Sequence, residues 1–427
     1  MQNRVQKKKK ISLTTMIFIA LLAGALTGVI INYLIPSNYV VDDIIVQGVF
    51  YIVGQGFIRL MRMLVVPLVF CSIVCGSMAV GDTKKLGSVG VKTLIFYLCT
   101  TALAITVALT IANIFNPGKG LDMSQIQVTS NVSETTQSMS MTETLLDIIP
   151  VNIFNSLSEG NMLQIIVFAL ILGVILANMG DRVDIVKNFF GQFNDIMMEM
   201  TMAVMKLAPI GVFCLIAKTF AEIGFEVFIP LLKYMFCVLL ALAVQCFVVY
   251  LGLLKTFSGL NPFIFIKNFF PVMAFAFSTS TSNATIPMNI DTLAEKMGVS
   301  KKISSFTIPL GATINMDGTS IMQGVAVVFT AQAFGIPLDM MDYLTVIGTA
   351  TLASIGTAGV PSVGLITLTM VFNSVGLPIE GIALIMGIDR ILDMTRTAVN
   401  ITGDAVCTTI VASWNKAVDR DVYYKQK

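Results

Sequence analysis

Long apolar stretches, each able to cross a bilayer, recur along the whole chain and are separated by short polar segments. A membrane-spanning helix needs about 20 apolar residues. The fifth stretch is the least regular, because Asp195, Glu199 and Lys206 leave it only a short uncharged core. The pattern predicts eight spans, near residues 11–35, 44–80, 87–115, 150–180, 188–218, 228–254, 303–333 and 379–412. We therefore expect an all-α polytopic membrane protein.

Two further uncharged segments do not fit the pattern of simple spans. Residues 268–290 contain a run of hydroxyl side chains from Ser278 to Ser282, which does not suit a regular helix in lipid. Residues 343–379 are too long for one span and are broken by small residues before Pro361. Irregular backbone at membrane depth is tolerated only inside protein or beside a water-filled cavity. We predict two re-entrant hairpins, arranged like an inverted repeat, whose tips point at a binding site; two kinked helices with a loop between them are the alternative.

Composition supports a membrane protein and excludes several functional classes. Hydrophobic residues make up 56% of the 427 residues, charged residues only 12%, and the mean hydropathy is +0.84. The net charge of +2 gives no indication of a nucleic-acid partner. Histidine is absent, and none of the seven cysteines forms a CxxC pair. Metal centres, disulfide frameworks and a membrane enzyme are therefore disfavoured, and any proton coupling would need carboxylates.

The positions of lysine and arginine predict the orientation in the membrane. Basic residues collect in the cluster from Lys7 to Lys10, in the loops that follow even-numbered spans, such as Lys84 and Lys85 after span two, and in the tail from Lys416; all of these segments fall on one side. Positive residues collect on the cytoplasmic side. We expect both termini in the cytoplasm, a polar external loop at 119–147, and a location in the plasma membrane.

Spans seven and eight carry ionisable groups, which are rare and usually functional inside a bilayer. In span seven, Asn315 and Asp317 interrupt an apolar helix and offer oxygens that suit a hard cation. In span eight, polar side chains advance by three or four residues and share a stripe roughly 100° wide. They are Asp389, Asp393, Arg396, Thr397, Asn400 and Asp404. Two interpretations stay open: mutual ion pairs, or a site in which Arg396 binds a carboxylate, Asp393 an ammonium, and Asp317 with Asp404 cations.

Four ordered motifs carry a resemblance to a known family. They are STSTSNATIP at 278–287, GATINMDGT at 311–319, ASIGTAGVP at 353–361 and DMTRTAVNITGD at 393–404. Together they resemble the dicarboxylate/amino acid:cation symporter family, which includes the glutamate transporters, over nearly the whole chain. The resemblance implies an inverted-repeat, elevator-type homotrimer in which a transport domain moves as a rigid body against a scaffold.

The same resemblance implies a division of the chain. Scaffold helices 1 and 2 would lie in residues 1–86, transport-domain helix 3 in 87–118, and an external loop with scaffold helices 4 and 5 in 119–225. The transport-domain core would occupy 226–413 with helices 6, 7 and 8 and both hairpins. A cytoplasmic tail would follow at 414–427.

Site residues are implied by motif. Substrate contacts would be Ser282, Thr319, Gly359, Asp393, Arg396, Thr397 and Asn400. One sodium site would use Gly311, Asn315, Asn400 and Asp404, and a second would use Thr313 with carbonyls of Ser354, Ile355 and Thr357. A third would use Tyr97, Thr100, Thr101, Asn315 and Asp317. No catalytic residue is expected.

Departures from the family pattern bear on the substrate and the coupling ion. Ser280 stands where archaeal members have an arginine, and Arg390 is a candidate to supply that charge. Gln323 replaces a glutamate of animal carriers, so potassium counter-transport is not expected. Arg396 with Asp393 favours L-glutamate or L-aspartate, taken up with Na⁺. Proton-coupled uptake of the same substrates, a C4-dicarboxylate symporter and an ion channel with re-entrant filter loops are the alternatives.

Overall fold

The computed structural model describes residues 13–81, 88–121, 146, 149–224, 228–355 and 363–424. Within these ranges the protein is nearly all helical, and the isolated bridge between Val299 and Val418 is the only β pairing described. Among the described residues, six helical stretches are long and apolar enough to cross a membrane. They are Thr15–Leu34, Val40–Met78, Val89–Phe115, Gln164–Met205, Phe228–Ser258 and Pro262–Thr279. The prediction of a helical membrane protein is confirmed at this level.

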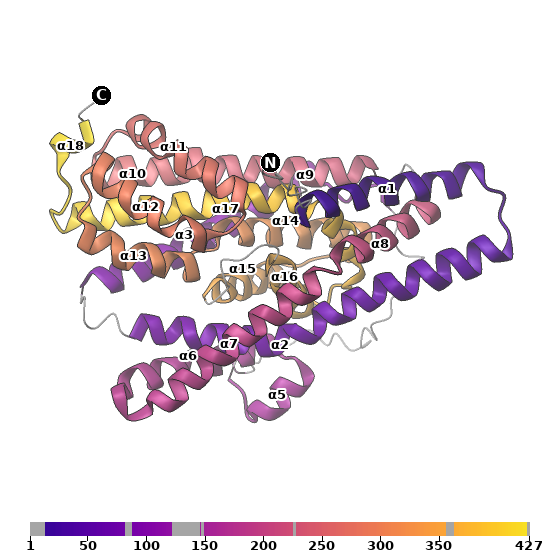
Figure 1. Cartoon of the computed structure of the whole chain (residues 1–427), viewed down its shortest axis with the longest axis horizontal. Helices are drawn as coiled ribbons and strands as arrows, with labels where there is room; N and C mark the ends of the chain where they lie inside the picture. Colours follow the sequence, from indigo (N-terminus) through magenta and orange to yellow (C-terminus); the bar gives the residue numbers. More distant parts are fainter. Residues whose placement is uncertain are drawn as a thin grey trace, which may run out of the picture.

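One group of helices comes from the first half of the chain. α1 packs along α8, and α2 contacts α6, α7 and α8 (Figure 1). Its members are α1 (Leu13–Leu34), the π-helical η1 (Val40–Phe50), α2 (Tyr51–Gly81), α5 (Ile153–Glu159), α6 (Met162–Met179), the 3₁₀ turn η3 (Gly180–Val183), α7 (Asp184–Met205) and α8 (Ala208–Ile223).

A second group combines one early helix with the second half of the chain. α17 contacts α9, α11, α13 and α14, and α3 packs against α14 and α9. The members are α3 (Ser88–Phe115), α9 (Phe228–Ala243), η5 (Val244–Tyr250), α10 (Leu251–Ser258), α11 (Pro262–Thr279), α12 (Ser282–Met297), α13 (Lys301–Ile314), α14 (Asp317–Ala333), α15 (Met340–Ser354), α16 (Val363–Ser374), α17 (Glu380–Trp414) and α18 (Arg420–Tyr424).

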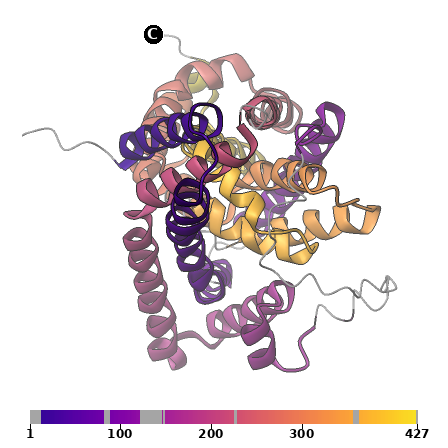
Figure 2. The same ribbon diagram turned by 90° about the vertical axis from the view of Figure 1, so that its right-hand side faces the viewer.

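The two groups meet where α17 crosses α1 and α8 and where α16 lies against α2 and α6. In Figure 1, α9, α10 and α11 lie along one edge of the molecule, and α5 and α6 lie along the opposite edge. Figure 2, turned by 90°, shows the magenta helices that follow residue 150 standing away from the helices of the second group.

Predicted span five differs from the structure. The sequence predicts one helix over 188–218, whereas α7 ends at Met205 and α8 begins at Ala208. Pro209 at the start of α8 has no backbone N–H and favours the first turn of a helix, so it ends one helix and begins the next. Predicted span four is likewise divided into α5 and α6 at Gly160, which has φ 73°.

The predicted break in span seven is present in the structure. α13 ends at Ile314, Asn315 has an extended backbone with φ −91° and ψ 93°, and α14 begins at Asp317. α14 is buried on all sides, with Asp317 fully buried at its first residue. Backbone groups at such a break lack their usual helical partners. Because residues 315–317 are buried, the break leaves polar backbone atoms in the protein interior.

Both predicted hairpin segments contain two helices. α11 and α12 pack against each other and are joined by Ser280 and Thr281, with Ser280 in the left-handed region at φ 52°. α15 and α16 also contact each other. The tip of this second pair, with the predicted site residues Thr357 and Gly359, lies outside the described residues.

Close packing of α1 on α8 depends on glycine. A Cβ at Gly28 would lie 2.5 Å from the Ala217 carbonyl oxygen and 2.6 Å from the Phe220 Cβ. Gly28→Ala should therefore force the helices apart and cost about 1–3 kcal/mol, as overpacked sites do. We expect a lower thermal unfolding midpoint in detergent.

Gly56→Ala is the matched control, because a Cβ at this α2 position would meet nothing within 4 Å. Alanine is the better helix former, so this variant should keep or slightly raise the midpoint. Equal midpoints for the two variants would contradict the packing account.

Candidate functional site

Asp317 is the centre of a buried polar cluster formed by α3, η5 and the start of α14. Its Oδ1 accepts a hydrogen bond from the Thr101 hydroxyl at 2.6 Å. Its Oδ2 accepts from the Tyr250 hydroxyl at 2.7 Å and from Gln245 Nε2 at 3.1 Å. Gln245 Nε2 also reaches the Thr100 carbonyl oxygen at 3.4 Å. A buried carboxylate needs such donors to offset the loss of water.

Asn315 joins this cluster to α17. Its Nδ2 donates to the Asn400 carbonyl oxygen at 3.1 Å and to Asp404 Oδ1 at 2.9 Å. The Asn400 side chain accepts from the Gly318 N–H at 2.7 Å, which ties α17 to the first turn of α14. Asp404 is 1% exposed. The break in span seven and the stripe of span eight therefore form one buried site.

Glycine makes room for Asp404. A Cβ at Gly311 would lie 2.4 Å from Asp404 Oδ1 and 2.5 Å from the Tyr97 hydroxyl oxygen. Any side chain at this position would displace the carboxylate. The four residues predicted for one sodium site, Gly311, Asn315, Asn400 and Asp404, are thus brought together.

Arg396 forms two ion pairs on the same helix. Its NH1 lies 2.8 Å from Asp389 Oδ1, and its NH2 lies 2.8 Å from Asp393 Oδ1. The guanidinium is 1% exposed. The mutual ion pairs considered from the sequence are therefore present. Breaking a buried pair of this kind is strongly destabilising.

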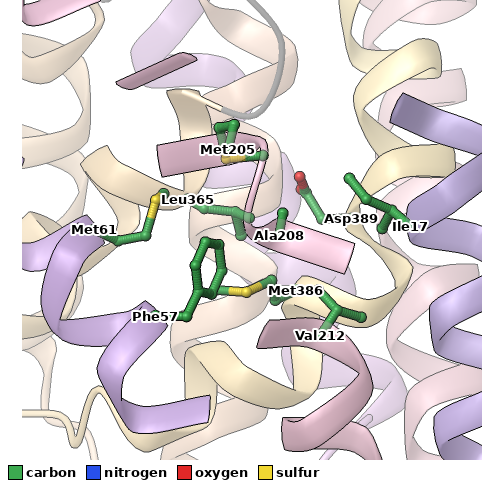
Figure 3. Close-up of a pocket in the computed structure, with 9 residues that line it drawn as sticks. All are labelled: Ile17, Phe57, Met61, Met205, Ala208, Val212, Leu365, Met386 and Asp389. Carbon is green, nitrogen blue, oxygen red and sulfur yellow. The ribbon is translucent and has the colours of Figure 1, made fainter. Parts of the chain in front are cut away.

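Asp389 places this charged group at the contact between the two helix groups. Figure 3 shows its side chain at a cavity of about 10 Å³ lined otherwise by apolar residues. Ile17, Phe57 and Val212 line it from the first group, and Leu365 and Met386 from the second. The cavity has about the room that one water molecule needs.

The remaining predicted site residues are buried at different places. Thr319 and Thr397 are each 7% exposed, and Thr397 donates to the Asp393 carbonyl oxygen at 2.9 Å. Ser282 is buried at the start of α12. Thr319 lies beside Gly364 of α16, where a Cβ would meet the Thr319 methyl group at 2.9 Å and Arg396 NH2 at 3.6 Å. Thr319 of α14 and Arg396 of α17 thus lie beside the same residue of α16.

The predicted second sodium site is not assembled by hydrogen bonds among the described residues. The Thr313 hydroxyl donates to the Leu310 carbonyl and the Ser354 hydroxyl to the Thr351 carbonyl, both within their own helices. Ile355 ends α15. Thr357 and Gly359 lie outside the described residues, as does the side chain of Arg390. Gln323 is buried, and its Nε2 donates to the Thr367 hydroxyl at 2.8 Å.

Two contributors to the site, Gln245 and Tyr250, are absent from the prediction, and Asp389 is in the predicted stripe but not in the predicted substrate or sodium sites. Gln245 and Tyr250 hold Asp317, and Asp389 pairs with Arg396. The pairing of Asp389 with Arg396 depends on the side-chain rotamers of both residues, which the sequence pattern does not give. The sequence does carry a signal for Gln245, since it is the single amide of predicted span six and lies in the apolar stretch after Lys233.

Tyr250→Phe tests whether the Asp317 carboxylate depends on its donors. The variant removes the 2.7 Å hydrogen bond and keeps the ring. A hydrogen bond to a charged group contributes about 1.5–3 kcal/mol, so we expect a lower thermal unfolding midpoint in detergent. Tyr424→Phe, at a residue 44% exposed, is the control and should leave the midpoint unchanged. An unchanged midpoint in Tyr250→Phe would mean that Asp317 is stabilised by other groups.

No group of three or more His, Cys, Asp or Glu side chains in the described part of the chain could hold a metal ion. The buried oxygens instead come from hydroxyls, amides, carbonyls and isolated carboxylates. Two amide oxygens, Asn315 Oδ1 and Gln245 Oε1, are buried and have no hydrogen-bond partner among the described atoms. Oxygens of this kind suit a hard cation.

Comparison with known proteins agrees with this chemistry. Residues 13–414 match the model of the sodium:dicarboxylate symporter family. A proton/sodium-glutamate symport protein from Bacillus caldotenax is 39% identical over 411 residues, covering 95% of both chains. A proton/glutamate-aspartate symporter from Escherichia coli (strain K12) is 36% identical over 422 residues, covering 97% of this chain and 95% of that protein.

The family also contains proteins named for other substrates. A C4-dicarboxylate transport protein from Ralstonia nicotianae is 32% identical over 409 residues, covering 95% of this chain and 93% of that protein. The ion-channel alternative finds no support in these comparisons. The chain belongs to the sodium:dicarboxylate symporter family, and it is a membrane transporter rather than an enzyme.

Proposed function

We propose that this protein is a secondary active symporter that takes up L-glutamate or L-aspartate together with Na⁺. The observation that carries the proposal is the arrangement of buried charge on α17. Arg396 with its two aspartates lies about one turn from Asn400 and about two turns from Asp404, and these two residues contact the break before α14. Relatives at 36–39% identity are named for glutamate or aspartate.

The Arg396 group supports an acidic amino acid as the substrate. A guanidinium offers a planar fork that matches a carboxylate. Asp393 supplies a countercharge for the ammonium group, which C4-dicarboxylates lack. Without substrate the two aspartates compensate the buried guanidinium; on binding, a substrate carboxylate would share the fork. Further substrate contacts are assigned to Ser282, Thr319, Gly359, Thr397 and Asn400.

The oxygen-rich cluster supports cation coupling. Asp404 accepts from the amide of Asn315, whose own oxygen is buried and unpartnered among the described atoms, and Asp317 is buried two residues further along. Tyr97, Thr100 and Thr101 line the same region from α3, and the Thr101 hydroxyl already reaches Asp317. A bound cation would neutralise charge that is costly inside a bilayer. The relatives are named for protons, or for protons and sodium, so the choice of Na⁺ rests on the oxygen ligands.

The two helix groups support the proposed division into scaffold and transport domain. The scaffold is assigned to residues 1–86 with the helices of 119–225, and the transport domain to 87–118 with 226–413. In this proposal α11 with α12 and α15 with α16 are re-entrant hairpins, eight segments cross the membrane, and the second hairpin closes over the loaded site. The protein would act as a homotrimer in the plasma membrane with both termini in the cytoplasm.

Uptake into proteoliposomes tests the substrate. With an inward sodium gradient, radiolabelled L-aspartate or L-glutamate should accumulate, and unlabelled aspartate should compete far better than succinate or L-serine. Efficient uptake of succinate or serine with negligible uptake of both acidic amino acids would contradict the assignment of Asp393 and Arg396. Cation flux without added substrate would indicate a channel instead.

A further inference from the structure

An apolar groove of about 350 Å³ lies on the surface between α3, α10 and the end of α17. α3 forms one wall with Phe96, Cys99 and Leu103, and α10 forms the other with Leu253 and Phe257. Trp414, the last residue of α17, also lines the groove. Leu103 is 42% exposed, Phe257 48% and Trp414 41%, so large apolar side chains face outward around an open depression.

The groove has the length of one acyl chain in a leaflet. Lys92, Phe96, Cys99 and Leu103 are spaced by three or four residues and therefore share one face of α3. At 1.5 Å per residue, this wall is about 16 Å long. Half of the hydrocarbon core of a bilayer is about 15 Å thick. The apolar wall thus spans the depth of a single leaflet, with Lys92 at one end.

Positive charge collects at that end of the groove. Lys92 lies near the start of α3, and Lys255 lies in the last turn of α10. Arg420 donates to the Ser258 carbonyl oxygen, which ends the same helix. Neither Lys92 nor Lys255 forms an ion pair with a carboxylate in the described part of the chain. An anionic group is therefore the complementary partner for this end.

Trp414 indicates that the end of the groove with Lys92 lies at the membrane–water interface. Its Nε1 donates to the Phe257 carbonyl oxygen at 3.2 Å, and its ring packs edge-on against Phe257 with centroids 5.8 Å apart. Tryptophan is enriched where the hydrocarbon meets the headgroups. The positive residues and Trp414 thus both place the end with Lys92 at the headgroup layer.

We propose that this groove binds one anionic phospholipid, with its phosphate on Lys92 and an acyl chain along Phe96, Leu103 and Leu253. The chemistry is that of basic sites between membrane helices, which select anionic headgroups. The groove also adjoins the candidate cation site, because Thr100 lines it and the Thr100 carbonyl oxygen accepts from Gln245, which holds Asp317. A bound acyl chain would keep water from the α3 wall of the groove.

Trp414 provides a direct test, because it is the only tryptophan in the chain. The full-length protein is reconstituted in mixtures of phosphatidylcholine and phosphatidylglycerol in which only one lipid carries bromine on its acyl chains. Bromine quenches tryptophan fluorescence at short range. One Lys near the surface favours an anionic lipid by about fivefold. Half-maximal quenching by brominated phosphatidylglycerol should therefore need about one-fifth of the mole fraction that brominated phosphatidylcholine needs.

Two variants locate the headgroup. Lys92→Gln should make the two quenching curves coincide, whereas Lys302→Gln, at an exposed lysine of α13, should leave the difference intact. An unchanged difference in Lys92→Gln would overturn the assignment of Lys92. Coincident curves in the native protein would overturn headgroup selection, and no quenching by either lipid would mean that protein covers the groove.

A third variant locates the acyl chain. Cys99→Phe adds bulk inside the groove and keeps Lys92. It should reduce quenching by brominated phosphatidylglycerol towards the phosphatidylcholine curve. Retention of the native curve would show that the lipid is held only as a counterion outside the groove. All of these measurements are made without substrate or a cation gradient, so their outcome is independent of the proposed transport function.

Discussion

Arg396→Leu should reduce uptake of L-aspartate and L-glutamate by at least about 100-fold, because loss of a buried charge partner costs about 3–5 kcal/mol. The guanidinium forms ion pairs with both Asp389 and Asp393. Its removal leaves no fork for a substrate carboxylate but retains Asp393 for an ammonium. Uptake of L-serine should therefore rise relative to that of L-aspartate.

The single variant also removes the Arg396 ion pair from each of two buried carboxyl groups, so its abundance needs a control. Arg396→Leu combined with Asp389→Asn removes one of those charges and should restore the amount of protein in the membrane. Acidic uptake should stay low in this double variant. Recovery of aspartate uptake together with abundance would show that Arg396 only stabilises the fold.

Asp404→Asn should raise the half-saturating sodium concentration for uptake by at least about tenfold. Two charges 4 Å apart interact by about 4 kcal/mol at an effective dielectric constant of 20, and each 1.4 kcal/mol is a factor of ten. Among the described side chains only Asn315 donates to Asp404, whereas Asp317 accepts from three. Asp404 therefore depends most on a cation for compensation.

The variant is chosen to separate coupling from folding. Asparagine has the same shape, and its oxygen can still accept from Asn315 Nδ2. Asp291→Asn is the control, because Asp291 is exposed and pairs with Lys301 on the surface. A normal sodium dependence in Asp404→Asn would remove this residue from the cation site. Absence of the variant from the membrane, with Asp291→Asn present, would indicate a structural role.

Part of the site could be predicted because local chemistry alone identifies it. Asn315 and Asp317 interrupt an apolar segment, and the structure has the helix break at these residues. The stripe of span eight lies on one uninterrupted helix, α17, and its side chains are buried. The helix break and the polar stripe each depend on residues close together in the sequence, so both can be predicted from the sequence alone.

Other parts depend on contacts between distant segments and could not be derived from periodicity. Tyr250 and Thr101 meet Asp317 across 67 and 216 positions of sequence. Arg396 pairs with both Asp389 and Asp393 in the structure. Its side-chain direction depends on tertiary packing, including the contact between α16 and α17, which periodicity does not give. Pro209 is a sequence signal for the break in span five. The charged residues of this span are equally compatible with one weakly apolar helix, so the sequence predicts one helix where the structure has two.

The most direct test of the account is accumulation of radiolabelled L-aspartate in proteoliposomes, with an inward sodium gradient compared with an inward proton gradient of equal driving force. We predict concentrative uptake with sodium and none with protons alone. Uptake driven only by protons would reassign Asp317 and Asp404 as proton carriers. Absence of uptake with either gradient would contradict the claim that this chain is a cation-coupled carrier of acidic amino acids.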